Sequence, residues 1–236
     1  MLGLICRGIM RIHKKYIFLV TSICFVVWFV CSNLKLPRDF GKTHFIVGAS
    51  SKKLLKKSQK IHSIEEMLKP GENGIHYTMF APDDNVLDVL VYLINKEKVS
   101  IRMAAFLLTD YKIVKAILEA RARGVQIEIV FDAKTVYGKN YKRVKLLKSR
   151  GVKIFVYKAR KKVKKNISKL MHNKFIIFGD NIYNRTLVWT GSFNFTYSAH
   201  MSNQENVVIF DDATSVKKFS DRFDYLKDTL CYAYKR

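Results

Sequence analysis

Residues 99–132, with the sequence VSIRMAAFLLTDYKIVKAILEARARGVQIEIVFD, decide the fold of this chain. The two ends of the stretch, Val99–Phe106 and Val125–Phe131, are apolar runs of the length of a β-strand. Between them, Thr109-Asp110 can cap a helix whose apolar residues recur at helical spacing, and Gly124 can end it. A strand, a helix and a strand in this order predict a right-handed crossover between parallel strands.

The same alternation continues on both sides of this stretch. Upstream, Ile75–Phe80 resembles a strand, and Ala81-Pro82-Asp83-Asp84 can cap a helix after it. Downstream, a helix over about Tyr141–Ser149 precedes a fourth strand at Val152–Tyr157. We therefore expect an α/β fold, a mixed, largely parallel β-sheet flanked by helices, in a domain that spans residues 74–236.

The last third of the chain predicts a hairpin, a further strand and a helix. Phe175–Phe178 and Leu187–Trp189 are the two strands of the hairpin, because Gly179–Arg185 between them holds the Gly, Asp and Asn residues typical of turns. Glu205–Phe210 is a last strand, and Ala213–Leu230 has the pattern of an amphipathic helix that closes the domain.

Residues 16–34 form an apolar segment without charge, preceded by a basic N-terminus over residues 1–15. A cleaved signal peptide is the alternative, but the apolar core is long and bulky, and Trp28–Cys31 offers no small-x-small cleavage site. We expect an uncleaved, single-pass membrane anchor at residues 16–34. A basic linker with a short helix follows over residues 35–73, and cations on both sides of the anchor leave its membrane and orientation open.

The charge balance predicts a polyanionic partner. The chain has 43 Lys+Arg against 19 Asp+Glu, a formal net charge of +24, and both nucleic acid and anionic phospholipid fit it. No acidic residue lies between Asp132 and Asp180, which favours a positive field over a merely solvated lysine-rich face. The densest point of this stretch supplies our candidate substrate-binding residues, Arg160, Lys161, Lys162, Lys164 and Lys165. The four cysteines predict neither a zinc site nor a disulfide framework.

The segment Met171–Asn206 groups side chains suited to breaking a phosphodiester. A histidine can attack phosphorus or protonate a leaving oxygen. A lysine, a hydroxyl and an amide can hold the non-bridging oxygens, and a carboxylate can orient an imidazole. The candidate catalytic residues are His172, Lys174, Ser192, Asn194 and Glu205. If a strand begins at His172, the side chains of His172 and Lys174 point the same way.

This segment resembles the single-motif nucleases of the phospholipase D superfamily, the branch with bacterial Nuc-like and mitochondrial cardiolipin hydrolase-like members and the H-x-K-x4-D signature. The resemblance is carried by His172-Asn-Lys174, Gly191-Ser-Phe-Asn-Phe-Thr196 and Asn203-Gln-Glu-Asn206. It extends upstream through Phe80-Ala-Pro82, Leu107-Leu-Thr-Asp110, Arg123-Gly-Val125 and Phe131-Asp132. The chain departs from the signature in one place, because its aspartate would fall at Gly179, and Asp180 comes one residue later.

The resemblance implies a two-step hydrolysis that needs no metal and no cofactor, through a phosphohistidine. Lys174 and Asn194 would stabilise the transition state with help from Ser192, and Glu205 would fix the tautomer of a catalytic histidine. Asp180 and Gly191 would be structural members of the motif. Because the chain has one motif, two copies would pair as a homodimer that joins His172 from each.

Three functions remain open at this point. The first is a nuclease that cleaves DNA or RNA, which the resemblance and the basic stretch favour. The second is a phospholipase D that acts on an anionic phospholipid such as cardiolipin, which the anchor favours. The third is an anchored nucleic-acid-binding protein that is inactive because of the Gly179 departure.

Overall fold

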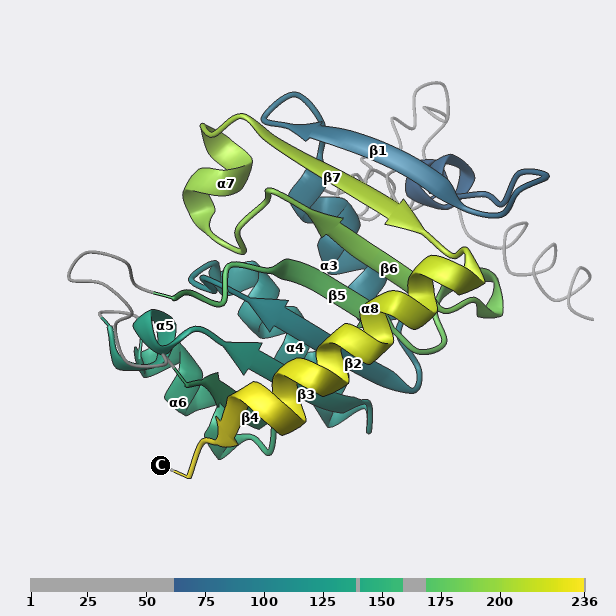
Figure 1. Cartoon of the computed structure of the whole chain (residues 1–236). Helices are drawn as coiled ribbons and strands as arrows, with labels where there is room; N and C mark the ends of the chain where they lie inside the picture. The colour runs from purple at the N-terminus through teal and green to yellow at the C-terminus, as the bar shows by residue number, and fades with distance from the viewer. Residues whose placement is uncertain (1–61, 139–140, 159–168, 236) are drawn as a thin grey trace, which may run out of the picture. The chain divides into compact units, whose positions relative to one another are not determined.

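The computed structural model describes residues 62–138, 141–158 and 169–235, and every structural statement below refers to these ranges. They form an α/β fold in which helices flank both faces of a mixed eight-stranded sheet (Figure 1). The expected anchor at residues 16–34 and the basic cluster Arg160–Lys165 lie outside the described residues. Within the described ranges, no helix has the length and apolarity needed to cross a membrane.

The sheet combines an antiparallel half with a parallel centre. Its strand order is β1 (His76–Ala81), β7 (Glu205–Phe210), β6 (Leu187–Gly191), β5 (Lys174–Phe178), β2 (Ser100–Ala105), β3 (Gln126–Phe131), β4 (Lys153–Tyr157) and β8 (Cys231–Ala233). Only the pairs β2 with β3 and β3 with β4 are parallel. The other five pairs are antiparallel. The expectation of a largely parallel sheet is therefore wrong.

The error has a physical reason in the position of β1. The crossover through α3 (Val86–Lys96) returns the chain in the same direction, as predicted, but β1 and β2 are not neighbours. Three strands from the last third of the chain, β5, β6 and β7, fill the space between them with antiparallel pairings. Hydrophobic periodicity identifies a strand but does not say which strand lies beside it.

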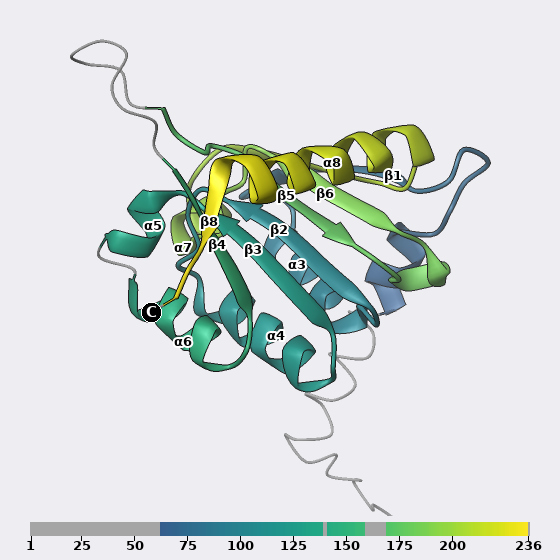
Figure 2. The ribbon, with the colours of Figure 1, turned by 60° about the horizontal axis from the view of Figure 1, so that its bottom comes forward.

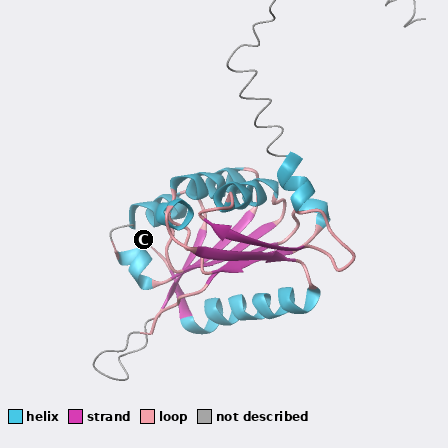
Figure 3. Cartoon of the chain, turned by 90° about the horizontal axis from the view of Figure 1, so that it is seen from above, coloured by secondary structure: helices cyan, strands magenta, loops and turns pink. Residues whose placement is uncertain are grey.

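Helices cover the two faces of the sheet unequally (Figure 2 and Figure 3). One face packs against α3, α4 (Tyr111–Ala122), α5 (Ala133–Tyr137) and α6 (Tyr141–Ser149), and the other against α8 (Ala213–Tyr225). A short α7 (Tyr197–Met201) connects β6 to β7, and a π-helical turn, η2 (Leu226–Leu230), leads from α8 into β8. Two separate clusters of buried apolar residues form the two cores.

The cap of α4 is as predicted, whereas the cap of α3 is not. The Asp110 carboxylate accepts hydrogen bonds from the backbone of Lys112 and Ile113, which stabilises the first turn of α4. At α3, Asn85 occupies the cap position without a side-chain hydrogen bond. The carboxylate of Asp84 instead accepts from the backbone N–H of Phe80 at 2.7 Å, so it closes the turn before the helix.

Candidate active site

The predicted site residues meet at one edge of the sheet, which we call the catalytic edge. Lys174 starts β5, Gly191 ends β6 and Glu205 starts β7, and these three strands are neighbours. The register pairs Phe175 with Thr190 and Gly191 with Val207, which aligns the three positions. The parallel strands β2 and β3 reach the same edge with their carboxyl ends, the place where open α/β sheets bind ligands.

His172 and Lys174 are in direct contact at this edge. Because β5 begins at Lys174, His172 lies just before the strand rather than in it, which corrects the assumption of a strand start at His172. The Lys174 ammonium lies 3.1 Å from His172 Nδ1 and donates to the His172 carbonyl oxygen at 2.8 Å. Lys174 is only 6% exposed, whereas His172 is exposed and can meet a substrate.

Phe106 completes this pair and was not identified from the sequence. Its ring lies 4.4 Å from the His172 ring and 5.2 Å from the Lys174 ammonium, which sits over its face. Its backbone is held on both sides, because its N–H donates to the Asn173 carbonyl and its carbonyl accepts from the Thr135 hydroxyl. Phe106 ends the apolar run of β2, so its place at the carboxyl end of a parallel strand was the available signal.

Asp132 fixes the backbone that leads into His172. Its buried carboxylate accepts from the N–H of Met171 at 2.9 Å and from the N–H of Lys134 at 2.9 Å. The second bond caps α5, and the first ties the segment before His172 to the end of β3. Asp132 is among the residues that carry the family resemblance, but the sequence alone indicated no role for it.

The electrostatics favour a neutral imidazole at His172. The side chain is exposed, but partial desolvation of its ring lowers its pKa. The nearby charge of Lys174 lowers this pKa further and Lys134 adds to the shift, while Asp132 opposes it. Burial likewise lowers the pKa of Lys174, against the pull of Glu205. A histidine with a lowered pKa is unprotonated at neutral pH, the form that can attack phosphorus.

Ser192 and Glu205 form a hydrogen-bonded pair across β6 and β7. The Ser192 hydroxyl donates to Glu205 Oε2 at 2.5 Å and accepts from the backbone N–H of Asn206 at 3.0 Å. Asn203 donates to the second oxygen of Glu205 at 3.1 Å. Within the described part of one chain, the hydrogen bonds of Glu205 thus go to Ser192 and Asn203 rather than to His172.

Asn194 lies in a loop that is anchored to the start of α4. The carbonyl oxygen of Phe195 accepts from the N–H groups of Thr109 and Asp110, and His200 Nε2 lies 3.1 Å from Asp110 Oδ2. The side-chain oxygen of Asn194 is buried and has no hydrogen-bond partner among the described residues. The side chain as a whole is half-buried, and its amide nitrogen, rather than this oxygen, is the group that can donate to a phosphoryl oxygen.

Gly191 is required by packing at the end of β6. A Cβ atom at this position would lie 2.1 Å from the carbonyl oxygen of Asn206, which is backbone and cannot move aside alone. Glycine therefore allows β6 and β7 to approach closely where Ser192 meets Glu205. The close approach of β6 and β7 at Gly191 gives a physical reason for the structural role expected of this glycine.

Gly179 and Asp180 lie at the opposite end of β5. The N–H of Gly179 donates to the Ser100 carbonyl, and a Cβ atom on Gly179 would lie 2.5 Å from the Ser100 hydroxyl. The Asp180 carboxylate lies 3.6 Å from the Lys98 ammonium. Asp180 is thus part of the connection after β5 and does not take part in the catalytic edge.

A buried glutamate organises this opposite end. Glu97 is 2% exposed and follows α3 directly. Its carboxylate accepts four N–H groups, from the backbone of Val99, Ser100 and Asp180 and from the side chain of Asn181. Glu97 therefore provides a structural carboxylate beside the position where the signature has aspartate and this chain has Gly179.

The arrangement suits attack on a phosphodiester by a single histidine. It places a neutral imidazole, a cation, an amide and a hydroxyl at one edge. Among the described residues no three His, Cys, Asp or Glu side chains gather in a way that could hold a metal ion. The fold and this edge define a protein of the phospholipase D superfamily of phosphodiesterases. A family model described as cardiolipin synthase, PLD-like domain, matches residues 90–227, and the chain belongs to that family.

Relatives with assigned names agree with this membership. Phospholipase D of Rickettsia prowazekii is 26% identical over 216 residues, which cover 92% of this chain and 96% of that protein. Phospholipase D of Rickettsia bellii is 33% identical over 139 residues, 58% of this chain and 61% of that protein. The mitochondrial cardiolipin hydrolase of Xenopus tropicalis is 27% identical over 143 residues, 61% of each chain.

Solved structures agree as well. Nuc from Salmonella typhimurium, a phospholipase D family member, has a TM-score of 0.58 and 25% identity, and the match covers 68% of this chain and 98% of that one. NucT from Helicobacter pylori has a TM-score of 0.60 at 22% identity, and the match covers 67% of this chain and 98% of that one. The second likeness supports the fold alone.

Proposed function

We propose that this protein is a membrane-anchored endonuclease that cleaves nucleic-acid phosphodiester bonds through a phosphohistidine, without a metal or a cofactor. The contact between the exposed His172 and the buried Lys174 carries the proposal, because it joins a neutral nucleophile to a fixed cation. A phosphate that approached His172 would meet a positive charge within a few ångströms of its oxygens.

The reaction has two steps. First, an unprotonated ring nitrogen of His172 forms a bond to phosphorus, and the bond from phosphorus to the leaving oxygen breaks. A second histidine donates the proton that this oxygen needs. Water then attacks phosphorus, the bond from phosphorus to the ring nitrogen of His172 breaks, and the same second histidine takes the proton of the water. Lys174 and Asn194 stabilise the charge on the phosphoryl oxygens in both steps, with Ser192 assisting.

The second histidine is the His172 of another copy in this proposal. One chain has one complete copy of the motif, in which His172-Asn-Lys174 is followed by Gly191–Thr196 and Asn203–Asn206. The other histidine beside the loop of Asn194, His200, is engaged with Asp110. A two-fold homodimer would bring two copies of His172 to one phosphate. In that dimer Glu205 would orient an imidazole while Ser192 and Asn203 hold its carboxylate in place.

Charge supports nucleic acid as the substrate. The formal charge of +24 and the absence of acidic residues between Asp132 and Asp180 suit a long polyanion. The cluster Arg160–Lys165 lies in the same stretch and would bind the backbone near the site. The apolar residues 16–34 support a single-pass anchor that keeps the domain at a membrane.

A phospholipase D acting on an anionic phospholipid such as cardiolipin is the second candidate. The relatives named phospholipase D and mitochondrial cardiolipin hydrolase favour it. A membrane anchor would also place the catalytic edge near lipid headgroups. An inactive nucleic-acid-binding protein is a third candidate, but His172, Lys174 and Asn194 are all present.

The test is turnover by the full-length protein in detergent with excess chelator. Labelled single-stranded and duplex nucleic acid and cardiolipin vesicles are offered as separate substrates, beside His172→Ala and, as a matched control, the exposed His76→Ala on β1. We expect nucleic-acid cleavage that persists in chelator, is lost in His172→Ala and is kept in His76→Ala. Turnover of lipid alone would support the second candidate, and binding without turnover the third.

The oligomeric state has its own test. Mass measurement in solution should find a dimer, and mixing wild type with excess His172→Ala should lower the activity per wild-type chain as mixed dimers form. An active enzyme that is strictly monomeric would contradict the paired-histidine reaction.

A further inference from the structure

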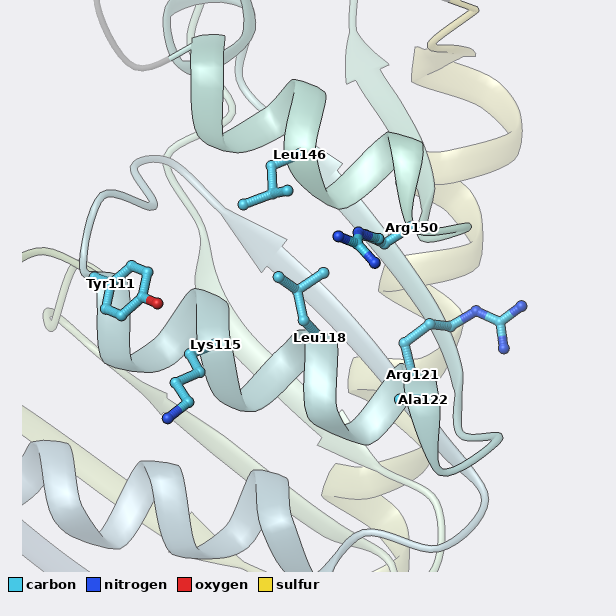
Figure 4. A pocket seen from close by; sticks show the side chains of 7 residues that line it. All are labelled: Tyr111, Lys115, Leu118, Arg121, Ala122, Leu146 and Arg150. Carbon is cyan, nitrogen blue, oxygen red and sulfur yellow. The ribbon is translucent and has the colours of Figure 1, made fainter.

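Helices α4 and α6 enclose a groove of about 390 Å³ on the face of the sheet opposite α8 (Figure 4). Leu118 and Leu146 point toward each other across its floor, and Tyr111 lies at one end. Three cations line it, Lys115 and Arg121 from α4 and Arg150 from the turn after α6. None of these residues belongs to the catalytic edge, so the mechanism leaves the groove without a role.

The groove starts beside the catalytic edge. Tyr111 is the first residue of α4 and is 60% exposed. The preceding residue, Asp110, is bonded through its N–H to Phe195, the neighbour of Asn194. From Tyr111 to Arg121 the helix rises by about 15 Å, enough to follow several nucleotides. A strand that leaves the site on this side would pass Tyr111 first and the cations after it.

The cations of the groove are poorly balanced by acids. Arg121 donates through Nε to the Gly151 carbonyl at 3.2 Å, which orients its guanidinium without neutralising it. Lys115 lies 3.7 Å from Glu119, and because both are more than half exposed the pair is weak. Helix α6 adds four further cations and has no acidic residue, and its cations are Lys142, Arg143, Lys145 and Lys148.

The end of the groove nearest the site also offers an aromatic surface. The Arg143 guanidinium lies 5.8 Å from the centre of the Tyr111 ring, a contact between α6 and α4. An exposed tyrosine beside an arginine can stack against a base and hold its phosphate. A flat bilayer would touch the rims of the two helices but could not enter between them, so the concave shape favours a strand.

We propose that the groove between α4 and α6 is a second binding site for the backbone of a nucleic-acid substrate, which holds the strand beyond the scissile phosphate through Lys115, Arg121 and Arg150. The proposal rests on the nuclease function proposed above and specifies how that substrate is held. The site reads phosphates and not sequence, and it contributes to the binding of long substrates only.

The test compares two triple variants with the same loss of charge on opposite faces of the sheet. Lys115→Gln, Arg121→Gln and Arg150→Gln remove the three cations that line the groove, and Lys217→Gln, Lys218→Gln and Arg222→Gln remove three cations from α8. Both are made in the full chain in a His172→Ala background, and the dissociation constant of a fluorescent 30-nucleotide strand is measured by anisotropy over a range of salt.

We expect the groove variant to bind about 10- to 100-fold more weakly at low salt and to lower the slope of log K against log salt by about two. The α8 variant should change affinity less than about threefold. Equal losses in both variants, or no loss in the groove variant, would overturn the proposal. Weaker binding to cardiolipin vesicles with unchanged binding to the strand would overturn it too and assign the surface to lipid.

Two controls separate this site from folding and from the proposed function. In the active background, the groove variant should hydrolyse a small chromogenic phosphodiester as wild type does, while its KM for the long strand rises. Because Arg121 holds the Gly151 carbonyl, the pair Lys115→Gln and Arg150→Gln serves if the triple variant does not fold. If the wild-type protein binds the strand through the groove but never cleaves it, the proposed nuclease function is contradicted, whereas the proposed binding site is supported.

Discussion

At one end of β5, the buried ammonium of Lys174 makes its hydrogen bonds to neutral groups of His172, whose imidazole is exposed. At the other end, the buried carboxylate of Glu97 receives four N–H groups and closes the connection to β2. Both ends bury one charge. The difference is that the charge of Glu97 is fully satisfied within the chain, while Lys174 is left able to bind an anion.

With the function proposed above, this contrast separates function from stability along β5, a strand of five residues. A satisfied buried charge holds elements together, and removing it costs folding free energy. A desolvated charge without a carboxylate partner, such as the Lys174 ammonium, lowers the free energy of unfolding. Its presence is therefore better explained by the binding of an anion than by stability. The departure from the signature at Gly179 lies at the Glu97 end of β5, away from the catalytic edge.

The largest effect is expected from paired lysine substitutions at the two ends. Lys174→Met keeps the length of the side chain but removes the cation, and we expect phosphodiester cleavage to fall by about 10²- to 10³-fold. The melting temperature should stay the same or rise, because a desolvated charge is lost. Lys98→Met, which removes the exposed cation that contacts Asp180 and Asn184, should leave activity within twofold. Equal activity in both variants would contradict the separation of the two ends.

The next largest effect is on stability. Glu97→Ala leaves four donors without their carboxylate, and we expect a loss of about 3 kcal/mol in the free energy of unfolding. For a domain of this size that lowers the melting temperature by about 6–12 °C. Well below the transition, the rate of cleavage should stay within threefold of wild type. A large loss of rate with an unchanged melting temperature would place Glu97 in the catalytic machinery instead.

The sequence marks the candidate residues at the His172 end far more clearly than those at the Glu97 end. The candidate catalytic residues come from one motif, lie within about 35 residues of each other, and are of residue types that suit phosphodiester cleavage. They are His172, Lys174, Ser192, Asn194 and Glu205. Glu97 is isolated in sequence, and its four donors come from two segments about 80 residues apart. Only the folded chain brings them together, so nothing local marks Glu97 as different from a surface glutamate.

The strand arrangement follows the same rule. Hydrophobic periodicity predicted nearly all of the strands and helices, because the side of an element that is buried shows in the spacing of its own apolar residues. It did not give the insertion of β5, β6 and β7 between β1 and β2, because pairing depends on contacts between distant segments. Phe106 was missed for a related reason. Its place at the end of an apolar run is visible in the sequence, but its contacts with His172 and Lys174 depend on the pairing of β2 with β5.

Phe106 is expected to show a moderate effect at the catalytic end. Phe106→Leu removes the ring that contacts both His172 and Lys174, and we expect kcat to fall about tenfold with little change in KM, because positioning is lost rather than binding. Phe106→Tyr keeps the ring and should restore most of the rate. If the leucine and tyrosine variants are equally impaired, the ring is not what positions the pair.

A smaller effect is expected when the signature is restored at the opposite end. In Gly179→Asp the new side chain meets the Ser100 hydroxyl, so we expect a loss of about 1 kcal/mol in the free energy of unfolding and no gain in activity. In a Ser100→Ala background the same substitution should cost less, which thermal unfolding of the four proteins would measure. A gain in cleavage rate from Gly179→Asp would show that the departure does weaken the enzyme.

The smallest effect concerns the charge around His172. The exposed Lys134 helps to lower the pKa of His172, so Lys134→Gln should raise that pKa and move the acid limb of the rate to higher pH. Because the folded pKa lies below the unfolded value of about 6.5, the contribution of His172 to stability is present above that pH and is lost as the pH falls through the folded pKa. NMR titration of the His172 ring, assigned with His172→Gln, checks the direction of the pKa shift, and Lys217→Gln on the far face should leave the pKa of His172 unchanged.

High salt should shrink the difference in this pKa between wild type and Lys134→Gln, because an exposed charge is screened. The larger lowering of the pKa by partial desolvation and by the adjacent Lys174 should persist. A His172 that titrated above the ordinary histidine value would instead be protonated at neutral pH, and this would contradict its assignment as the unprotonated nucleophile.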